Sequence, residues 1–168
     1  MSCAITGGYT IECRESVGGI QTLWVLEKSK LTSYSVSGGV LTAITTTTDF
    51  WKIEVPRATA FASNSITASQ ENGTFFYTHE INFPINSRSA SVRNLINVLA
   101  KNKCSFVTLE GDGQYRLYGA SFGLFLDSAE SGSGTALADR SGYMAKFSSQ
   151  ETEDFILCPA NIIADVLG

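Results

Sequence analysis

The sequence predicts a mainly β fold: an antiparallel β-sandwich or barrel with one packed α-helix near residues 90–101 and a long β-hairpin over residues 58–85. Three observations lead to this fold class. Short apolar or alternating runs, separated by Gly-centred turns, recur along most of the 168 residues. One segment alone follows the helical repeat clearly. No internal repeat or interdomain linker divides the chain.

The longest predicted element is the hairpin, whose arms are residues 58–70 and 74–85, joined by a tight Asn72-Gly73 turn. At about 3.3 Å per residue the first arm spans roughly 43 Å, whereas ordinary strands have about 5–6 residues. That arm consists almost entirely of Ala, Ser, Thr and Asn. The second arm carries large side chains at its odd positions, which we expect to face the core: Phe75, Tyr77, His79, Ile81, Phe83 and Ile85.

Shorter apolar or alternating runs predict the other strands. Glycine-centred turns separate several of them, and Pro56 ends one, because proline cannot continue a hydrogen-bonded ladder. The predicted strands are residues 23–26, 31–36, 40–44, 50–55, 105–109, 114–118, 123–126, 143–149 and 155–157.

The predicted helix rests on spacing and on its two ends. Apolar residues recur at i, i+3, i+4 and i+7 in the set Val92, Leu95, Ile96 and Leu99. Ser89 is a suitable N-cap, and Asn102 fits the position just after the last turn. The apolar stripe of this helix is wide enough to cover one face of a sheet.

We expect one domain over residues 1–168, with three less regular parts. Residues 1–21 are Gly-rich and predict an N-terminal arm. Residues 128–142 contain a Ser-Gly-Ser-Gly run and predict a flexible loop. Residues 159–168 follow Pro159 and predict a short C-terminal tail. The first residues lack a basic and apolar leader, and no run reaches 18 apolar residues, so we expect neither a signal peptide nor a membrane span.

Charge is scarce and unevenly distributed. Charged residues make up 17% of the chain and the net charge is −4, which disfavours a DNA-binding protein that neutralises phosphates. Residues 1–109 carry a net charge of +2 and residues 110–168 one of −6. Low charge is typical of assembly subunits, and this asymmetry suits copies that meet head to tail through different patches.

The residues that hold metals or form disulfides are few and scattered. The four cysteines, Cys3, Cys13, Cys104 and Cys158, lack zinc-ligand spacing, and we expect reduced thiols while leaving a disulfide open. His79 is the one histidine, and its place in the alternating arm predicts a buried, hydrogen-bonded structural residue. We therefore expect no metal site and no cofactor.

We also expect that the chain is not an enzyme. Residues 119–123 match the G-x-S-x-G pattern of a nucleophile elbow, which requires a strand before it, a helix after it and a later histidine. Here a strand is predicted to follow, and no histidine does. The carboxylates are scattered, so the sequence marks no catalytic residue, although a glycosidase pair stays open.

Several segments together resemble a family of small virion proteins from tailed bacteriophages that infect Bacteroidetes. The resemblance covers most of the chain at the level of pattern. It is carried by Ser2-Cys3-Ala4-Ile5-Thr6, Cys13-Arg14-Glu15-Ser16-Val17-Gly18-Gly19-Ile20, Glu71-Asn72-Gly73-Thr74, Arg93-Asn94-Leu95, Leu99-Ala100-Lys101-Asn102, Ser133-Gly134-Thr135-Ala136 and Asp139-Arg140-Ser141-Gly142-Tyr143.

This resemblance implies a tail tube protein. Such a protein is a β-sandwich with a flanking helix, and six copies join their sheets into a ring with an inner β-barrel. Rings stack head to tail, contact other tail proteins and form a channel that DNA crosses without specific binding. The implied location is the virion, after assembly in the cytoplasm of the bacterial host. One departure is that the hairpin contains only two acids, Glu71 and Glu80, so it does not predict an acidic channel.

Two other functions stay open. The first is another ring-forming virion protein, such as a tail terminator, a connector or a sheath-like protein. The second is a carbohydrate-binding β-sandwich on the virion surface, whose platform would need exposed aromatic side chains at Trp24, Trp51, Tyr115 and Tyr118. For assembly, we expect residues 58–85 to add strands to a ring, and residues 2–19 and 161–167 to bridge stacked rings.

Overall fold

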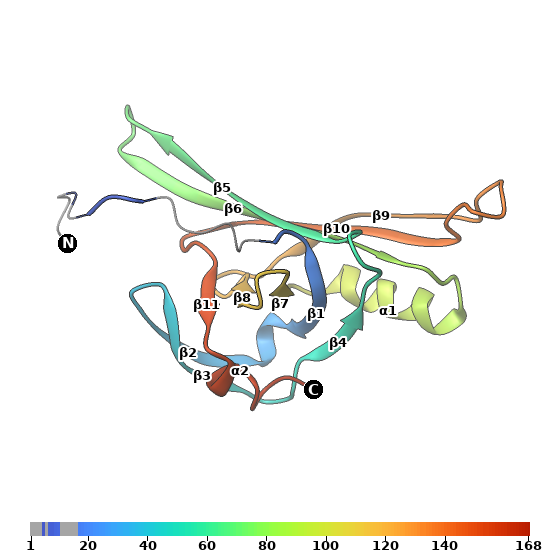
Figure 1. Cartoon of the computed structure of the whole chain (residues 1–168), viewed down its shortest axis with the longest axis horizontal. Coiled ribbons are helices and arrows are strands. Elements are labelled where there is room, and N and C mark those ends of the chain that lie inside the picture. Colours follow the sequence, from blue (N-terminus) through green and yellow to red (C-terminus); the bar gives the residue numbers. More distant parts are fainter. Residues whose placement is uncertain (1–4, 6, 11–16) are drawn as a thin grey trace.

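The computed structural model, which describes residues 5, 7–10 and 17–168, stacks a small β-sheet on a larger one (Figure 1). The predicted mainly β class is therefore confirmed, and the sandwich form holds, because the described strands close no barrel. The larger sheet has the order β2-β3-β11-β8-β7-β1-β4. Its strands are β1 (Ile20–Glu27), β2 (Leu31–Ser37), β3 (Val40–Thr46), β4 (Trp51–Glu54), β7 (Cys104–Glu110), β8 (Tyr115–Tyr118) and β11 (Ile156–Cys158).

The smaller sheet has the order β5-β6-β10-β9 and is antiparallel throughout. Its strands are β5 (Phe61–Ser69), β6 (Thr74–Ile85), β9 (Phe125–Gly132) and β10 (Gly142–Glu151). These are the longest strands of the molecule on average, and they extend past the body of the protein at both ends (Figure 1). This sheet therefore has a central part that covers the core and two overhanging ends.

The main core lies between the two sheets. At its centre Phe83 stacks on Phe147 with a centroid distance of 5.8 Å, and Phe106 of the larger sheet meets Phe147 at 4.9 Å. All three rings are fully buried. A mixture of tilted, stacked and edge-on rings fills this space densely, so the aromatic cluster fixes the distance between the sheets.

A second core lies on the other face of the larger sheet. The sheet curls around Trp24, Leu41 and Phe50, which are buried together with Ile163 of the short helix α2 (Ala160–Ile163). Strands β1 and β7 are thus buried on both faces, which explains why their sequences read as continuous apolar runs.

The C-terminal residues complete this second core. The Phe50 amide donates to the Val166 carbonyl at 2.8 Å, and the Gly168 amide donates back to the Phe50 carbonyl at 3.0 Å. Ile163 is fully buried. The tail therefore packs on its own domain, and the expectation that residues 161–167 bridge stacked rings stays a prediction.

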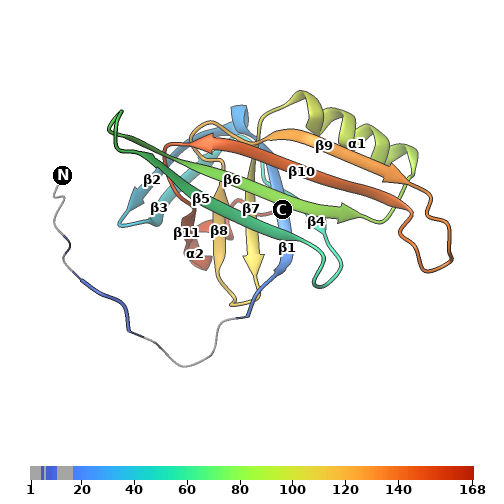
Figure 2. The same ribbon diagram turned by 90° about the horizontal axis from the view of Figure 1, so that it is seen from above.

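The predicted helix forms over the predicted residues, as α1 (Ala90–Lys101), and flanks β9 at the side of the sandwich (Figure 2). The Ser89 hydroxyl accepts from the Val92 amide at 3.4 Å, which confirms the N-cap. Ile96 and Leu99 are buried against the main core. Asn102 follows the last turn as predicted and ends the helix in extended backbone at φ −117°, with its amide donating to the Leu99 carbonyl.

The long β5–β6 hairpin has a shorter first arm than the sequence predicts. Strand β5 begins at Phe61, because Ala58 adopts φ +59° in a turn that precedes the strand. Ser69 pairs with Thr74, so a four-residue loop replaces the predicted two-residue turn. Only Gly73 of that loop has positive φ, at +63°.

A second long hairpin takes up both ends of the predicted flexible loop. Strand β9 continues to Gly132 and pairs with β10 from Gly142 onward, so the irregular part of residues 128–142 is only residues 133–141. The predicted strand 123–126 covers the start of β9, and its continuation to Gly132 was missed because those residues are rich in Ser, Gly and acidic residues. The segment forms a strand because it pairs with β10, although its own residues have low β-propensity.

Candidate assembly surface

The smaller sheet ends in two strands that pair with no further described strand, β5 on one side and β9, which α1 flanks, on the other. Unpaired strand edges offer rows of N–H and C=O groups to another chain, and monomeric proteins usually protect them with charge, proline or a bulge. The strand β5 has none of these devices, since Phe61–Ser69 contains no charged residue and no proline and pairs with β6 without a register shift. The β5 edge is therefore open for strand addition.

The β9 edge differs from the β5 edge, because it carries charged residues and a register shift. Its pairing with β10 shifts register between Lys146 and Phe147, and it carries two acids, Asp127 and Glu130. Strand β5 pairs antiparallel with β6, β6 with β10, and β10 with β9. The strands β5 and β9 consequently run in opposite directions, so a β5 edge placed beside a β9 edge continues an antiparallel sheet.

The tip of the β5–β6 hairpin overhangs the body of the protein (Figure 1). Apolar side chains on the face that continues the core side of the sheet are exposed there. Ile66 is 62% exposed and Phe75 is 64% exposed. Phe75 meets Tyr77 edge-on at 5.9 Å. The predicted burial of the odd positions holds for His79, Ile81 and Phe83 and is wrong for Phe75, because no second sheet lies beneath the overhang.

The opposite, outward face of the smaller sheet is mildly acidic, and it also carries the exposed Phe61 and Phe125. Glu80 contacts Lys146 at 3.6 Å and accepts a hydrogen bond from the Asn82 amide at 2.8 Å. Asp127 accepts from the Ser148 hydroxyl, and Glu130 lies opposite Met144 on the same face. Sequence reasoning found only Glu80 here, because the predicted strand 123–126 ends before Asp127, and Glu130 lies in the predicted loop 128–142.

His79 lies at the root of the hairpin, on the core side of β6. It is 2% exposed and packs edge-on against Tyr118 at 5.5 Å. Neither of its ring nitrogens has a hydrogen-bonding partner among the described residues. The predicted burial is right and the predicted hydrogen bond is wrong. Burial lowers the pKa of His79 below 6.5, although the carboxylates of Glu151 and Asp154 favour its charged form.

The G-x-S-x-G segment forms a clamped loop between strands. The buried Glu151 carboxylate accepts from the amides of Phe122 at 2.9 Å and Gly123 at 3.1 Å and from the Ser149 hydroxyl at 2.8 Å. The strand β8 precedes the loop, and Leu124 then bridges to Cys104 before β9 begins. No helix follows the serine, so the geometry of a nucleophile elbow is absent from this loop.

A carboxylate pair on the β7–β8 hairpin is held by one arginine. Arg116 reaches Glu110 at 2.9 Å and Asp112 at 2.8 Å, and the Tyr118 hydroxyl donates to Glu110 at 3.0 Å. The hydrogen bond from Arg116 lowers the pKa of Asp112, while burial raises the pKa of Tyr118. Because Arg116 engages both carboxylates, this group stabilises the hairpin rather than presenting an acid and a base.

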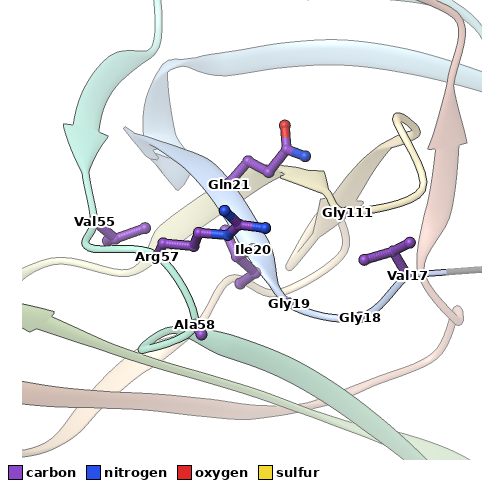
Figure 3. A pocket seen from close by; sticks show the side chains of 9 residues that line it. All are labelled: Val17, Gly18, Gly19, Ile20, Gln21, Val55, Arg57, Ala58 and Gly111. Atoms are coloured by element: carbon purple, nitrogen blue, oxygen red, sulfur yellow. The ribbon is translucent and has the colours of Figure 1, made fainter.

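The N-terminal arm enters the domain beside a surface cavity of about 480 Å³ (Figure 3). Gly111 donates its amide to the Gly19 carbonyl at 2.8 Å, and a Cβ on Gly111 would lie 2.7 Å from the Val17 carbonyl oxygen. Ala58, just before the hairpin, lines the same cavity. The arm therefore leaves the body near the start of the hairpin. Most of residues 2–19 lie outside the described residues.

The remaining expected absences concern thiols, metals and membranes. Cys104 and Cys158 are free and buried, and burial raises the pKa of each thiol to about 12, whereas Cys3 and Cys13 lie outside the described residues. Within residues 5, 7–10 and 17–168, no cluster of three His, Cys, Asp or Glu side chains is placed to hold a metal. None of the helices in that part of the chain has the length and apolarity to cross a membrane.

Comparisons with protein-family models, with curated proteins and with solved structures found no match to this chain. The case for a function consequently rests on the geometry above and on the sequence segments that carry the resemblance.

Proposed function

We propose that this chain is a structural virion subunit, the major tail tube protein of a tailed bacteriophage, which assembles side by side into rings. The observation that carries the proposal is the pair of free edges on one sheet, with the uncharged β5 on one side and the oppositely directed β9 on the other. The resemblance of the sequence to phage virion proteins supports the same reading.

Joining the two edges produces a ring rather than a dimer. The contact is heterologous, because the β5 edge of one copy meets the β9 edge of the next, and a heterologous contact closes when its rotation permits. Closure removes every free edge of the smaller sheet. The family resemblance implies six copies, with rings stacked head to tail and contacts to other tail proteins.

The outward face of the smaller sheet would then line the channel. It presents Ser and Thr from β5 together with Glu80, Asp127 and Glu130 against one cation, Lys146. A mildly acidic wall repels DNA, which carries about one negative charge per 1.7 Å. This charge is consistent with DNA that passes without specific binding.

The two alternative functions fit the free strand edges and the exposed aromatic side chains to different degrees. Another ring-forming virion protein, such as a terminator, connector or sheath-like protein, would use the same free edges, and a single ring per particle would favour it. The carbohydrate-binding alternative is weakened, because Trp24 and Tyr118 are buried and only Trp51 of the proposed platform is largely exposed.

The test compares ring formation in the wild-type protein and in an edge variant. We expect electron microscopy of concentrated wild-type protein to show rings or tubes. An Ile66→Lys variant places a charge on the β5 edge, a device that blocks strand addition, and it should stay monomeric. Ile66→Thr is the matched control and should assemble. Ile66 is exposed, so we expect melting of the monomer to change little. A wild-type protein that stays monomeric at every concentration contradicts the proposal.

A further inference from the structure

Three lysines surround a hollow of about 420 Å³ on the flank that contains the start of β9. Lys28, Lys101 and Lys103 line it together with the exposed Phe122, and no acidic residue of the described chain lines it. None of these lysines forms a salt bridge with a described residue, whereas four other cations, Lys30, Lys52, Arg116 and Lys146, do. In a protein of net charge −4, such a concentration of unbalanced positive charge indicates an anionic partner.

The backbone brings these lysines together. The Lys28 amide donates to the Lys103 carbonyl at 2.8 Å. The stems of both lysines close over Gly123, where an added Cβ would lie 3.0 Å from Lys103 Cβ and 3.1 Å from Lys28 Cβ. The Lys103 ammonium lies 5.1 Å from the ring centroid of Phe125, the first residue of β9. The hollow is therefore fixed to the N-terminal end of the β9 edge.

Strand direction determines what a neighbouring copy would bring to that end. Because β5 and β9 run in opposite directions, a neighbour's β5 paired with this β9 has its C-terminal end at Phe125. The loop that follows β5, residues 70–73, then projects toward the hollow. It carries a single charged residue, the exposed Glu71.

We propose that the lysine hollow is the receptor for the hairpin tip of the next copy in the ring, with the Glu71 carboxylate among the three ammonium groups. Charge complementarity identifies a second copy of this chain as the occupant. This inference rests on the proposed side-by-side assembly and names the contact that sets its register.

Charge reversal on either side of the contact tests the inference. Glu71→Lys alone, or Lys28→Glu with Lys103→Glu, places like charges together and should raise the concentration for half-maximal ring formation at least about tenfold, a cost of ~1.4 kcal/mol. The triple variant that combines all three reversals restores opposite charges and should return most of the lost assembly. Lys52→Glu on β4 is the control and should assemble like the wild-type protein.

The outcomes separate this inference from the proposed function. Wild-type protein that forms no rings overturns both. Rings that form equally well in every reversal variant overturn the receptor and leave side-by-side assembly in place. A 20-nucleotide DNA that binds the wild-type monomer, with binding lost in Lys28→Glu/Lys103→Glu while rings form normally, would assign the hollow to nucleic acid and overturn the inference. Thermal melting of each monomer confirms that the variants fold.

Discussion

At the scale of single residues, the most unusual feature is a histidine buried without hydrogen bonds. His79 lies on β6, between β5 and β10 in the smaller sheet, and neither of its ring nitrogens forms a hydrogen bond with a described residue. An unpaired polar group in the interior costs stability, about 1–3 kcal/mol by the usual range. The alternation of β6 predicted that this position is buried, but no pattern in a sequence reports whether a buried polar atom finds a partner.

His79 predicts how stability depends on pH. Burial lowers its pKa in the folded protein below 6.5, so the unfolded chain binds more protons as the pH falls through 6.5. The stability contribution of neutral His79 is complete above that pH and declines toward the lowered pKa. We expect chemical unfolding of His79→Leu to show less loss of stability than wild type between pH 7.5 and pH 5. Parallel stability curves for the two proteins would contradict this assignment.

At the scale of elements, the sequence predicted a helix or strand correctly where the residues of that one segment are enough to specify it. The helix α1 has its apolar stripe and its Ser89 cap, and β6 has strict alternation. Local pattern failed for the polar second half of β9, beyond the predicted strand 123–126, which becomes a strand through pairing with β10. It also failed for Phe75, because the end of a hairpin can overhang its core and a sequence does not reveal where the second sheet stops.

The β5–β6 loop gives a prediction at this scale. Gly73 has φ +63°, which a β-branched residue adopts only with strain of about 1–2 kcal/mol. The loop is exposed and lies beyond the core, so we expect Gly73→Val to reduce ring yield more than it lowers the melting temperature of the monomer. Gly73→Asn is the control, because asparagine tolerates positive φ. Equal losses of melting temperature and ring yield in Gly73→Val would refute the prediction.

At the scale of the whole molecule, the chain builds two cores around one large sheet. The main core packs the two sheets together, and the second is closed by the C-terminal residues. The sequence predicts a free apolar tail at residues 161–167, because the residues that pack with this end of the chain, Phe50 and Trp24, lie more than a hundred positions away. Only the closed curl of the larger sheet makes them part of the interior.

The role of the tail is tested by truncating a buried side chain. Ile163 is fully buried, and we expect Ile163→Ala to lower the free energy of unfolding by about 2–4 kcal/mol. Val98→Ala on the exposed side of α1 is the control, with an expected loss below about 1 kcal/mol. Urea unfolding measures both values. Similar small losses in the two variants would mean that the tail adds little to the domain.

The sequence by itself determined the mainly β class, the helix with its cap, the long β6 strand and the scarcity of residues suited to chemistry. These follow from local propensity and periodicity, which act between neighbours in the chain. The tertiary structure alone decided that β5 and β9 end the smaller sheet of the described chain and run in opposite directions, and that three lysines converge beside β9. It also decided that His79 forms no hydrogen bond with a described residue and that the tail folds inward. Each of these depends on contacts between distant segments, and a single sequence does not encode such contacts as a local pattern.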